Sequence, residues 1–361
     1  MENPKNKMLN FTVGPVMTWD EILDIGGHQV PYFRTAEFSD IMKDNEKNML
    51  DFSNASDKSR TVFLTGSGTM AMEVAIVSTL SIQDKALIIN GGGFGQRFVN
   101  LCKLHGISYD EVKLDIGEAL TADILDNYNP VDYTAFIVNM HETSTGVLYD
   151  MDVISKFCKL GNIFLIVDAI SAFLADPLDM QAMGIDVMIT SSQKALACAP
   201  GISMLTLTPR ALERVNASEY KNMYMDLKDA LSNADRGQTP FTPAVSTILQ
   251  INKRLQMVKD KGGPQEEIER VHGIATYFRN KIKDLPLELI SKSPSNAVTC
   301  LHADGVSAKE IVDRMKDEFN IWVCPNGGTY SDYMFRVGHI GNITHDDIDV
   351  LVNSLRKVIL Q

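Results

Sequence analysis

The chain has 361 residues, of which 45% are hydrophobic and 22% are charged, and its formal net charge is −12 at pH 7. This composition is typical of a globular protein and excludes an intrinsically disordered chain, which carries far fewer apolar residues. An acidic surface repels phosphate backbones and anionic lipids, so we expect neither nucleic acid nor a membrane as a partner. A local basic pocket for a small anion is compatible with this charge.

The five cysteines are scattered along the chain and form no C-x-x-C pair. We therefore predict neither a zinc site nor a disulfide framework, and we expect no metal. Residues 1–10 are polar and lack the apolar core of a secretory signal, and the longest apolar stretches have only the length of a strand. We expect a cytoplasmic protein.

Short runs of β-branched and apolar residues recur through the first two thirds of the chain. Each run is followed by a loop rich in Gly, Ser, Thr or Asp and then by a helical pattern. Runs that are apolar on both faces indicate strands covered on both sides, as in a mostly parallel sheet, so the alternation predicts an α/β fold. The predicted strands are 61–64, 86–90, 135–139, 163–168, 186–190 and 202–207.

The pattern changes after about residue 246 and becomes typical of a small α+β domain packed on a larger one. A break at Lys261-Gly262-Gly263-Pro264 separates two long helical patterns. The predicted elements of this tail are helices over 247–259, 266–283, 307–319 and 345–358, strands over 297–301 and 321–324, and a glycine-rich loop over 326–329.

In an open α/β sheet, ligands bind beyond the carboxyl ends of the strands, so the loops after the predicted strands are candidate sites. The first of them, Gly66-Ser67-Gly68, lies between a strand and an apolar helix. Free backbone N–H groups, the helix dipole and hydroxyls would make a phosphate cradle there, although such a glycine turn also joins a strand to a helix without any ligand. Residues 66–71 also fit a dinucleotide fingerprint, but Asn90 and Gly91 stand where its acidic residue is expected.

Two charged residues follow later strands. Asp168 ends a buried run, where a carboxylate is costly unless a cation meets it. It is a helix cap, a metal ligand or a partner for a protonated heterocyclic nitrogen. Lys194 follows Ser191-Ser192-Gln193 and is either solvated or an amine nucleophile whose pKa is lowered by its pocket.

A phosphate cradle, a carboxylate and a lysine at one edge of a sheet match the needs of pyridoxal phosphate. The lysine forms a Schiff base, the carboxylate keeps the pyridine nitrogen protonated, and the cradle holds the 5′-phosphate. Phe94, in the loop Gly91-Gly92-Gly93-Phe94-Gly95, either stacks on the ring face or is an ordinary core residue.

The order and spacing of these loops resemble a known family over nearly the whole chain. The chain is similar to fold-type I, class V pyridoxal-phosphate aminotransferases. Within them it most resembles the alanine–glyoxylate, serine–pyruvate and 2-aminoethylphosphonate–pyruvate aminotransferases. The segments that carry the resemblance are 12–15, 65–69, 142–148, 167–171, 192–196, 240–243 and 335–341.

The resemblance implies a large domain with a mostly parallel seven-stranded sheet sandwiched by helices, and a smaller C-terminal α+β domain. Residues 1–18 would form an N-terminal arm that contributes to the substrate site. Residues 19–260 would form the domain that binds pyridoxal 5′-phosphate, and residues 261–361 the small domain. A homodimer with shared active sites would complete each site.

The resemblance also implies roles for single residues. Lys194 would hold the cofactor and, once released, move a proton between the substrate carbon and the cofactor, while Asp168 would pair with the pyridinium nitrogen. Arg336 would clamp the acid group of the substrate in a fork of donors, with Gly14 beside the substrate.

The other residues of the implied site bind the cofactor. Phe94 would stack on its ring, and Thr143 would lie beside the ring, hydrogen-bonded to the cofactor or to Asp168. Thr242 would reach the phosphate of the neighbouring subunit. The rest of the implied phosphate site consists of Ser67, Gly68, Thr69 and Gln193.

Two segments depart from the family pattern. Gly91-Gly92 stands where Asn-Gly is common, and the run of three glycines that begins there indicates a loop with more freedom. Val13 precedes Gly14-Pro15 where the family usually has Pro-Gly-Pro. Neither departure removes a catalytic group.

The implied activity is a ping-pong transfer between a small-molecule amino donor and a 2-oxo acid, pyruvate or glyoxylate. Segments 324–330 and 335–341 are closest to the 2-aminoethylphosphonate enzymes, whereas 192–196 is closer to the alanine–glyoxylate and serine–pyruvate enzymes. We expect 2-aminoethylphosphonate as the donor, with alanine–glyoxylate or serine–pyruvate aminotransferase as the alternative.

Three other functions stay open. A cysteine desulfurase of the same fold would use Cys324 as a nucleophile, but Gln193 and Phe94 stand where those enzymes usually have histidines. A nicotinamide dehydrogenase would use residues 66–71 but gives Lys194 no role. A catalytically silent binding subunit would need neither Lys194 nor Asp168.

Overall fold

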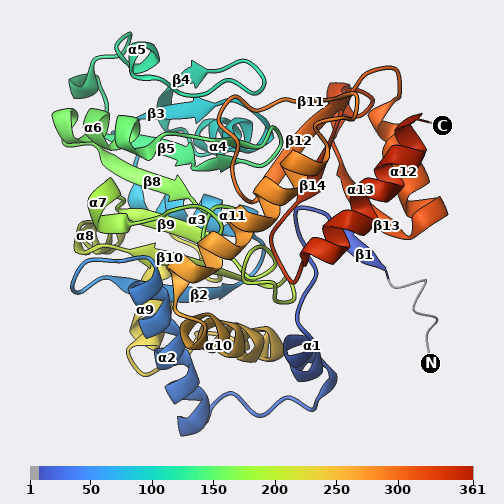
Figure 1. The fold of residues 1–361 in the computed structure, drawn as a ribbon. Helices are drawn as coiled ribbons and strands as arrows, with labels where there is room; N and C mark the ends of the chain where they lie inside the picture. The colour runs from blue at the N-terminus through green and yellow to red at the C-terminus, as the bar shows by residue number, and fades with distance from the viewer. Residues whose placement is uncertain (1–7, 361) are drawn as a thin grey trace.

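Two sheets organise the chain (Figure 1), and the computed structural model describes residues 8–360 of it. Residues 1–7 of the expected arm and residue 361 of the expected small domain lie outside the described residues. One sheet has seven strands drawn from residues 60–207, and the other has five strands drawn from both ends of the chain. The seven-stranded, mostly parallel sheet confirms the predicted α/β fold.

The large sheet collects the carboxyl ends of most of its strands at one edge. Only β10 runs antiparallel to its neighbours, and the other six strands share one direction. The loops after those six strands therefore leave from the same edge. The strands in spatial order are β2 (Arg60–Thr65), β10 (Ile202–Leu207), β9 (Val187–Ser191), β8 (Phe164–Asp168), β5 (Ala135–Asn139), β3 (Lys85–Asn90) and β4 (Ser108–Lys113).

Both faces of the large sheet are covered, because successive side chains of a strand point to opposite sides. Leu87 and Ile89 of β3 enter one core, and Ala86 and Ile88 enter the other. Each fully buried Leu or Ile side chain contributes about 1.5–3 kcal/mol to stability. The first core is shared with α1 (Asp20–Gly27), α2 (Ala36–Phe52), α6 (Met151–Gly161), α7 (Met180–Met183) and α10 (Val245–Asp260), and the second with α3 (Gly68–Thr79), α4 (Gly93–Leu104), α8 (Pro209–Ala217) and α9 (Leu227–Ala234).

The second sheet joins the start of the described chain to its end. Its first strand, β1 (Leu9–Phe11), pairs in parallel with β13 (Ile321–Pro325). A third core fills the space between this sheet and its helices. The remaining strands in order are β14 (Met334–Gly338), β12 (Val298–Ala303) and β11 (Leu287–Leu289), and the helices are α11 (Pro264–Lys281), α12 (Ala308–Phe319) and α13 (His345–Leu360).

Short elements connect these layers. A hairpin of β6 (His141–Glu142) and β7 (Val147–Leu148) projects from the end of β5. The other short helical segments are α5 (Ala122–Leu125), η2 (Pro130–Asp132) and η3 (Gly328–Tyr330).

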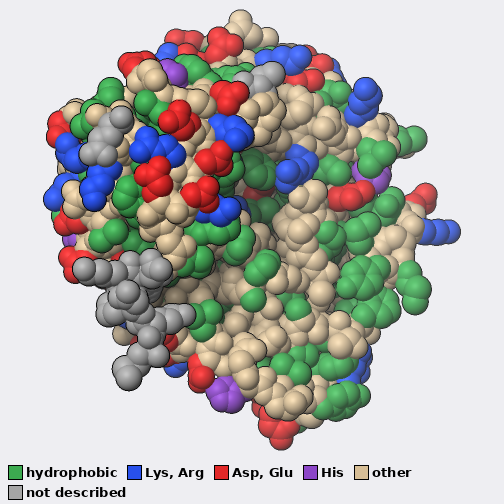
Figure 2. Space-filling view, turned by 90° about the vertical axis from the view of Figure 1, so that its right-hand side faces the viewer, with side chains coloured by type: hydrophobic (Ala, Val, Ile, Leu, Met, Phe, Trp, Pro, Cys, Tyr) green, Lys and Arg blue, Asp and Glu red, His purple; other side chains and the backbone are tan. Residues whose placement is uncertain are grey.

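The surface bears charges of both signs. On the face shown in Figure 2, acidic and basic side chains are interspersed over one part, and hydrophobic side chains are more frequent over another. Within residues 8–360, no helix combines the length and the apolar composition needed to cross a bilayer.

Candidate active site

Lys194 and Asp168 meet at the carboxyl edge of the large sheet. Asp168 is the last residue of β8 and pairs with Ile189 of the adjacent strand β9, which leads directly into the turn that holds Lys194. Both side chains are buried, with exposed fractions of 9% for Lys194 and 5% for Asp168. The Lys194 Nζ atom donates a hydrogen bond of 2.6 Å to the backbone oxygen of Val13.

Burial shifts both of these groups toward neutrality. Burial lowers the pKa of Lys194 to about 8, with the Asp168 charge opposing that shift and the Arg336 charge adding to it. Burial raises the pKa of Asp168 to about 7, against the hydrogen bond of 2.8 Å from Ile170 N and the charge of Lys194. An amine that gives up its proton this readily is suited to nucleophilic and proton-transfer chemistry.

The predicted phosphate cradle lies beside this pair. Ser67 precedes α3, and its side chain makes no capping hydrogen bond, so the N–H groups of the first turn are available to an anion. A Cβ atom on Gly68 would lie 2.5 Å from Cδ1 of Ile170, which follows Asp168 in the neighbouring loop. A side chain at this position would force the Ile170 side chain to move. Gln193 is half-buried, and its Oε1 accepts a hydrogen bond of 2.5 Å from Ser191 Oγ.

Glu142, to which sequence analysis gave no role, fixes the loop that carries Phe94. Its fully buried carboxylate accepts hydrogen bonds from Phe94 N at 3.1 Å and Gly95 N at 3.0 Å. It also accepts one of 2.9 Å from Asn139 Nδ2. The carboxylate thus meets the positive end of α4 and holds Phe94 at its first turn.

The glycines before Phe94 are packed closely, which corrects the expectation of a freer loop. A Cβ atom on Gly91 would lie 2.2 Å from the Tyr149 hydroxyl oxygen, and one on Gly92 would lie 2.4 Å from Ser144 Oγ. These positions need glycine because side chains from the β6–β7 region fill the space. The run therefore serves close packing.

Arg97 is a second residue near the site that sequence analysis did not identify. It lies on α4, one turn after Phe94, and its guanidinium carbon is 4.7 Å from the centroid of the Phe94 ring. Its Nη1 donates a hydrogen bond of 2.8 Å to Thr69 Oγ1 in the cradle. The only available signal was the position of a basic residue three residues after the aromatic one.

Arg336 is held at the site by two backbone oxygens. Arg336 lies on β14. Its Nη1 donates a hydrogen bond to Thr143 O at 3.1 Å, and its Nη2 donates one to Pro325 O at 2.6 Å. Its Nε is buried and has no hydrogen-bond partner among the described residues. The Thr143 hydroxyl is hydrogen-bonded to Ser171 Oγ at 2.8 Å.

The N-terminal arm passes directly over Lys194. A Cβ atom on Gly14, where φ is +134°, would lie 2.8 Å from Lys194 Cδ. The Thr18 hydroxyl donates to Ala197 O on the Lys194 loop, and a Cβ atom on Gly338 would lie 2.4 Å from Thr12 O. The arm therefore fits between the Lys194 loop and the small sheet.

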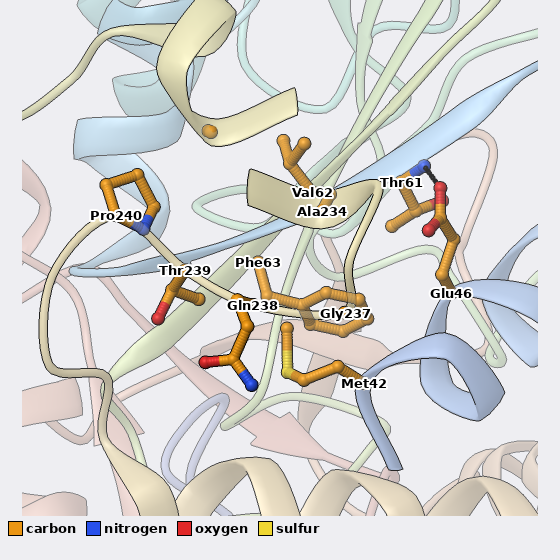
Figure 3. Close-up of a pocket in the computed structure, with 11 residues that line it drawn as sticks. Met42, Glu46, Thr61, Val62, Phe63, Ala234, Gly237, Gln238, Thr239 and Pro240 are labelled. Atoms are coloured by element: carbon orange, nitrogen blue, oxygen red, sulfur yellow. Dashed lines mark hydrogen bonds between the residues drawn. The ribbon is translucent and has the colours of Figure 1, made fainter. Parts of the chain in front are cut away.

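Thr242 is exposed, in a loop beside β2. Arg34 holds the start of this loop by donating to Thr239 O at 2.8 Å and Pro240 O at 3.0 Å. Figure 3 shows the segment from Gly237 to Pro240 next to Phe63 and Met42, around a cavity of about 10 Å³. Such a cavity holds about one water molecule, so it is no ligand site.

Two other expectations concern metals and cysteines. Within residues 8–360, no group of three or more His, Cys, Asp or Glu side chains is placed to hold a metal ion. Cys324 is half-buried on β13, and the other four cysteines are buried.

Comparison with known proteins identifies relatives over the whole chain. A relative from Anabaena cylindrica, named as the soluble hydrogenase 42 kDa subunit, is 30% identical over 99% of this chain and 94% of its own length. An L-aspartate–glyoxylate aminotransferase of Paracoccus denitrificans is 28% identical over 78% of this chain and 74% of its own. A 2-aminoethylphosphonate–pyruvate transaminase of Phocaeicola vulgatus is 26% identical over 94% of this chain and 92% of its own length.

Solved structures share the fold. The alanine–glyoxylate aminotransferase of Nostoc sp. superposes with a TM-score of 0.90 at 23% identity, over 100% of this chain and 97% of that one. The family model for class-V aminotransferases matches residues 27–349. The chain therefore belongs to the class-V aminotransferases, and it is a transaminase of fold type I with pyridoxal 5′-phosphate as its cofactor.

Proposed function

We propose that this enzyme transfers the amino group of a small, acid-bearing donor to glyoxylate or pyruvate, and that 2-aminoethylphosphonate is the donor. The observation that carries the proposal is a buried lysine amine whose pKa is influenced by a buried carboxylate and by an arginine held at the same site. The identity of the donor is supported by the similarity of segments 324–330 and 335–341 to the 2-aminoethylphosphonate enzymes and by the Phocaeicola vulgatus relative.

The residues present fit the cofactor. Pyridoxal 5′-phosphate supplies an aldehyde and an electron-withdrawing ring. Lys194 offers an amine with a lowered pKa, and the first turn of α3 offers free N–H groups to an anion. Asp168 is a carboxylate that gains a partner when a cationic ring nitrogen meets it, so its pKa would then fall and it would remain charged.

In this proposal Lys194 is the nucleophile and the proton carrier. Its Nζ would take the proton from the substrate carbon that bears the amino group and pass it to the cofactor, and in the second half-reaction it would move a proton in the opposite direction. Val13 O accepts a hydrogen bond from the same Nζ and so orients the amine. Phe94, Thr143 and Gln193 would contact the cofactor beside it.

Arg336 would bind the acid group of either substrate. Two backbone oxygens already fix the direction of its guanidinium group, so little side-chain entropy is lost when an anion binds. The unpartnered Nε and the second hydrogen of an Nη group can then donate to a carboxylate or phosphonate. A buried donor without a partner is costly, and a bound acid group removes that cost.

We further propose a cytoplasmic homodimer in which Thr242 reaches the phosphate site of the neighbouring subunit. Large apolar side chains are exposed near the Thr242 loop, including Met223 at 80% and Tyr224 at 54%. The Tyr224 ring stacks on Phe241, with centroids 5.4 Å apart, next to Thr242. An exposed apolar patch of this kind is typical of an interface. The free cysteines agree with a reducing compartment.

An absorption spectrum tests the proposal directly. The purified protein is loaded with pyridoxal 5′-phosphate, and its visible band is followed after 2-aminoethylphosphonate is added without an oxo acid. Loss of the band with formation of pyridoxamine phosphate supports both the transaminase activity and the donor. If the band persists with 2-aminoethylphosphonate but is lost with alanine, serine or aspartate, the donor assignment is wrong. Sulfide release from cysteine would point instead to a lyase that uses Cys324.

A further inference from the structure

The proposed phosphate site has a charge imbalance. A phosphate monoester carries about −1.5 to −2 charges near neutral pH. The residues assigned to its cradle are uncharged, and the helix end contributes only about half a positive charge. They are Ser67, Gly68, Thr69, Gln193 and Thr242. A cation near the cradle would offset the rest of this charge in a chain whose net charge is −12.

Arg97 is the cation that the fold brings to this cradle. Its Nη1 lies 2.8 Å from Thr69 Oγ1, and it occupies the first turns of α4 beside the amino end of α3. Because the Thr69 oxygen accepts this hydrogen bond, the Thr69 hydroxyl hydrogen is left free to donate to an anion. Thr69 is itself exposed, so an anion can approach both groups from solvent.

Within the described part of the chain, the charge of Arg97 is not paired with a carboxylate. No carboxylate of residues 8–360 forms an ion pair with it, in contrast to Arg60 and Arg214, which are paired with Glu46 and Asp84. Burial is the largest influence on the pKa of both Asp168 and Lys194, and Arg97 is among the charges that lower both values. The field of the guanidinium group therefore extends to the reacting groups.

We propose that Arg97 is the cationic residue of the cofactor phosphate site, where it neutralises the phosphate and positions Thr69 and Phe94. This inference rests on the proposed cofactor-binding roles of the cradle residues. A purely structural alternative is that Arg97 only supports the Phe94 ring, through the contact of 4.7 Å. The two differ in whether the effect of losing Arg97 depends on the phosphate group of the ligand.

Comparison of pyridoxal 5′-phosphate with pyridoxal, which lacks the phosphate, separates these roles. Dissociation constants are measured by absorbance titration of cofactor-free wild type, Arg97→Met and Arg97→Lys. We expect Arg97→Met to weaken binding of the phosphorylated form by about 10- to 100-fold and to leave pyridoxal binding within about 2-fold. Arg97→Lys should recover part of the lost affinity, because a lysine supplies the positive charge but lacks the paired N–H donors of a guanidinium group.

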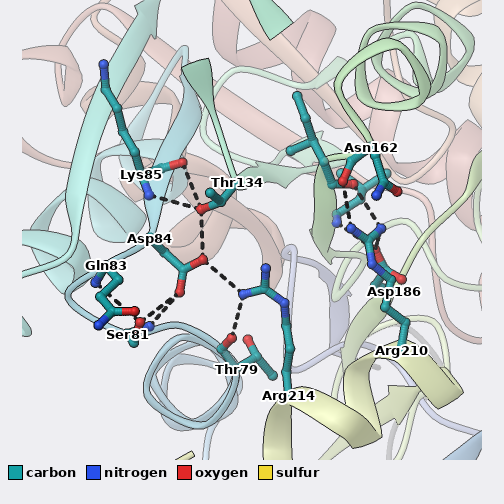
Figure 4. A network of polar contacts seen from close by, with 12 residues as sticks. Thr79, Ser81, Gln83, Asp84, Lys85, Thr134, Asn162, Asp186, Arg210 and Arg214 are labelled. Carbon is teal, nitrogen blue, oxygen red and sulfur yellow. Dashed lines mark hydrogen bonds and ion pairs between the residues drawn. The ribbon is translucent and has the colours of Figure 1, made fainter. Parts of the chain in front are cut away.

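Arg214 offers a matched control at the far end of the sheet (Figure 4). Figure 4 shows Arg214 hydrogen-bonded to Asp84. The Arg214 guanidinium carbon lies 4.5 Å from the centroid of the Phe164 ring, much as Arg97 lies over Phe94. Arg214→Met should leave both dissociation constants unchanged. It shows whether loss of any arginine packed on an aromatic ring affects the site.

The outcomes distinguish failure of this inference from failure of the proposed function. Equal weakening of both ligands in Arg97→Met would mean that Arg97 only supports the ring, and no weakening would mean that it has no part in the site. Either result overturns the inference while wild type still binds the cofactor. If wild type takes up neither ligand, the proposed cofactor site itself is wrong.

Discussion

The two ends of the large sheet hold the same kinds of charged groups in opposite conditions. At the amino ends, Asp84 accepts from Arg214 Nη1 at 3.0 Å, Ser81 N at 2.8 Å and Thr134 Oγ1 at 2.7 Å (Figure 4). Burial alone would raise the pKa of Asp84, but these hydrogen bonds outweigh it and the pKa lies below its usual value. Asp168, at the carboxyl end, has the opposite shift.

The difference separates an end of the sheet whose charged groups support stability from the end where the chemistry is proposed. Asp84 has its partners within the chain, so its charge is already satisfied. Asp168 and Lys194 are buried with fewer partners, which makes the cofactor-free site costly to hold. In the proposed site, a bound ligand would supply the missing contacts and recover that cost. Substitutions at the two ends should therefore have different consequences.

The largest effect is expected from Lys194→Ala. Removal of the amine removes the proposed nucleophile and proton carrier, so kcat should fall by roughly 10⁴-fold or more. Lys159→Ala, a change of an exposed lysine on α6 at the other end of the sheet, should leave kcat unaltered. Steady-state assays of both variants with the same donor make the comparison. Turnover near the wild-type rate in Lys194→Ala would show that another group is the nucleophile.

Asp168→Asn should lower kcat by about 10²- to 10³-fold, because the charge proposed to hold the ring nitrogen protonated would be lost. The same substitution should raise the stability of the cofactor-free protein. The pKa of Asp168 is raised from 3.8 to about 7 in the fold, so the stability that this carboxyl supplies at low pH is lost as the pH rises toward 7. The cofactor-free variant should therefore be more stable than wild type at pH 8.

Asp84→Asn provides the opposite case. Its lowered pKa means that the carboxylate stabilises the fold above the unfolded pKa and that this contribution is lost as the pH falls. The free energy of unfolding at pH 7 should drop by about 1–3 kcal/mol, with kcat unchanged. Urea unfolding of both cofactor-free variants at pH 5 and pH 8 measures this, and a loss of stability in Asp168→Asn at pH 8 would contradict the comparison.

Arg336→Ala should act on substrate binding. With the guanidinium group gone, KM for the oxo acid should rise by about 10- to 100-fold while kcat changes less. Arg336→Lys should restore little, because a lysine has no fork of donors. Arg356→Ala, which removes a partly exposed arginine of α13 that pairs with Asp284, serves as the control. An unchanged KM for the oxo acid in Arg336→Ala would rule out the anchoring role.

The smallest effect is expected from Gly14→Ala. The added methyl would meet Lys194 Cδ at 2.8 Å and would sit at a φ of +134°, which costs roughly 1–3 kcal/mol. We expect kcat/KM to fall about 10-fold as the amine is displaced. Gly273→Ala, where nothing lies within 4 Å of the added atom, should leave kcat/KM at the wild-type value.

The strands that sequence analysis found are those buried on both faces. Predicted strands such as 86–90 and 202–207 lie within one residue of β3 and β10, because a continuous apolar run has few other solutions. β4 was missed because Ser108–Lys113 is an edge strand with polar, partly exposed residues. β1 was missed because its three residues become a strand only by pairing with residues more than three hundred positions later.

In the candidate site, too, local patterns could be recognised from the sequence and long-range contacts could not. Lys194 and Asp168 could be found because each follows a recognisable strand, and the fold brings them to one edge. Glu142 and Arg97 act through hydrogen bonds to Phe94 N and Thr69 Oγ1. Those contacts depend on how loops distant in sequence meet, and no local pattern predicts them.

The pairing of β1 with β13 has a consequence for how the enzyme is made. Residues 9–11 lie beside residues 321–323, and a few positions later Val13 accepts the hydrogen bond from Lys194. The large sheet, drawn from residues 60–207, can form while synthesis is still under way. The arm cannot be seated until nearly the whole chain has emerged, and contacts of such long range form slowly. A chain cut short after the large sheet would lack the partner strand that seats the arm over its lysine.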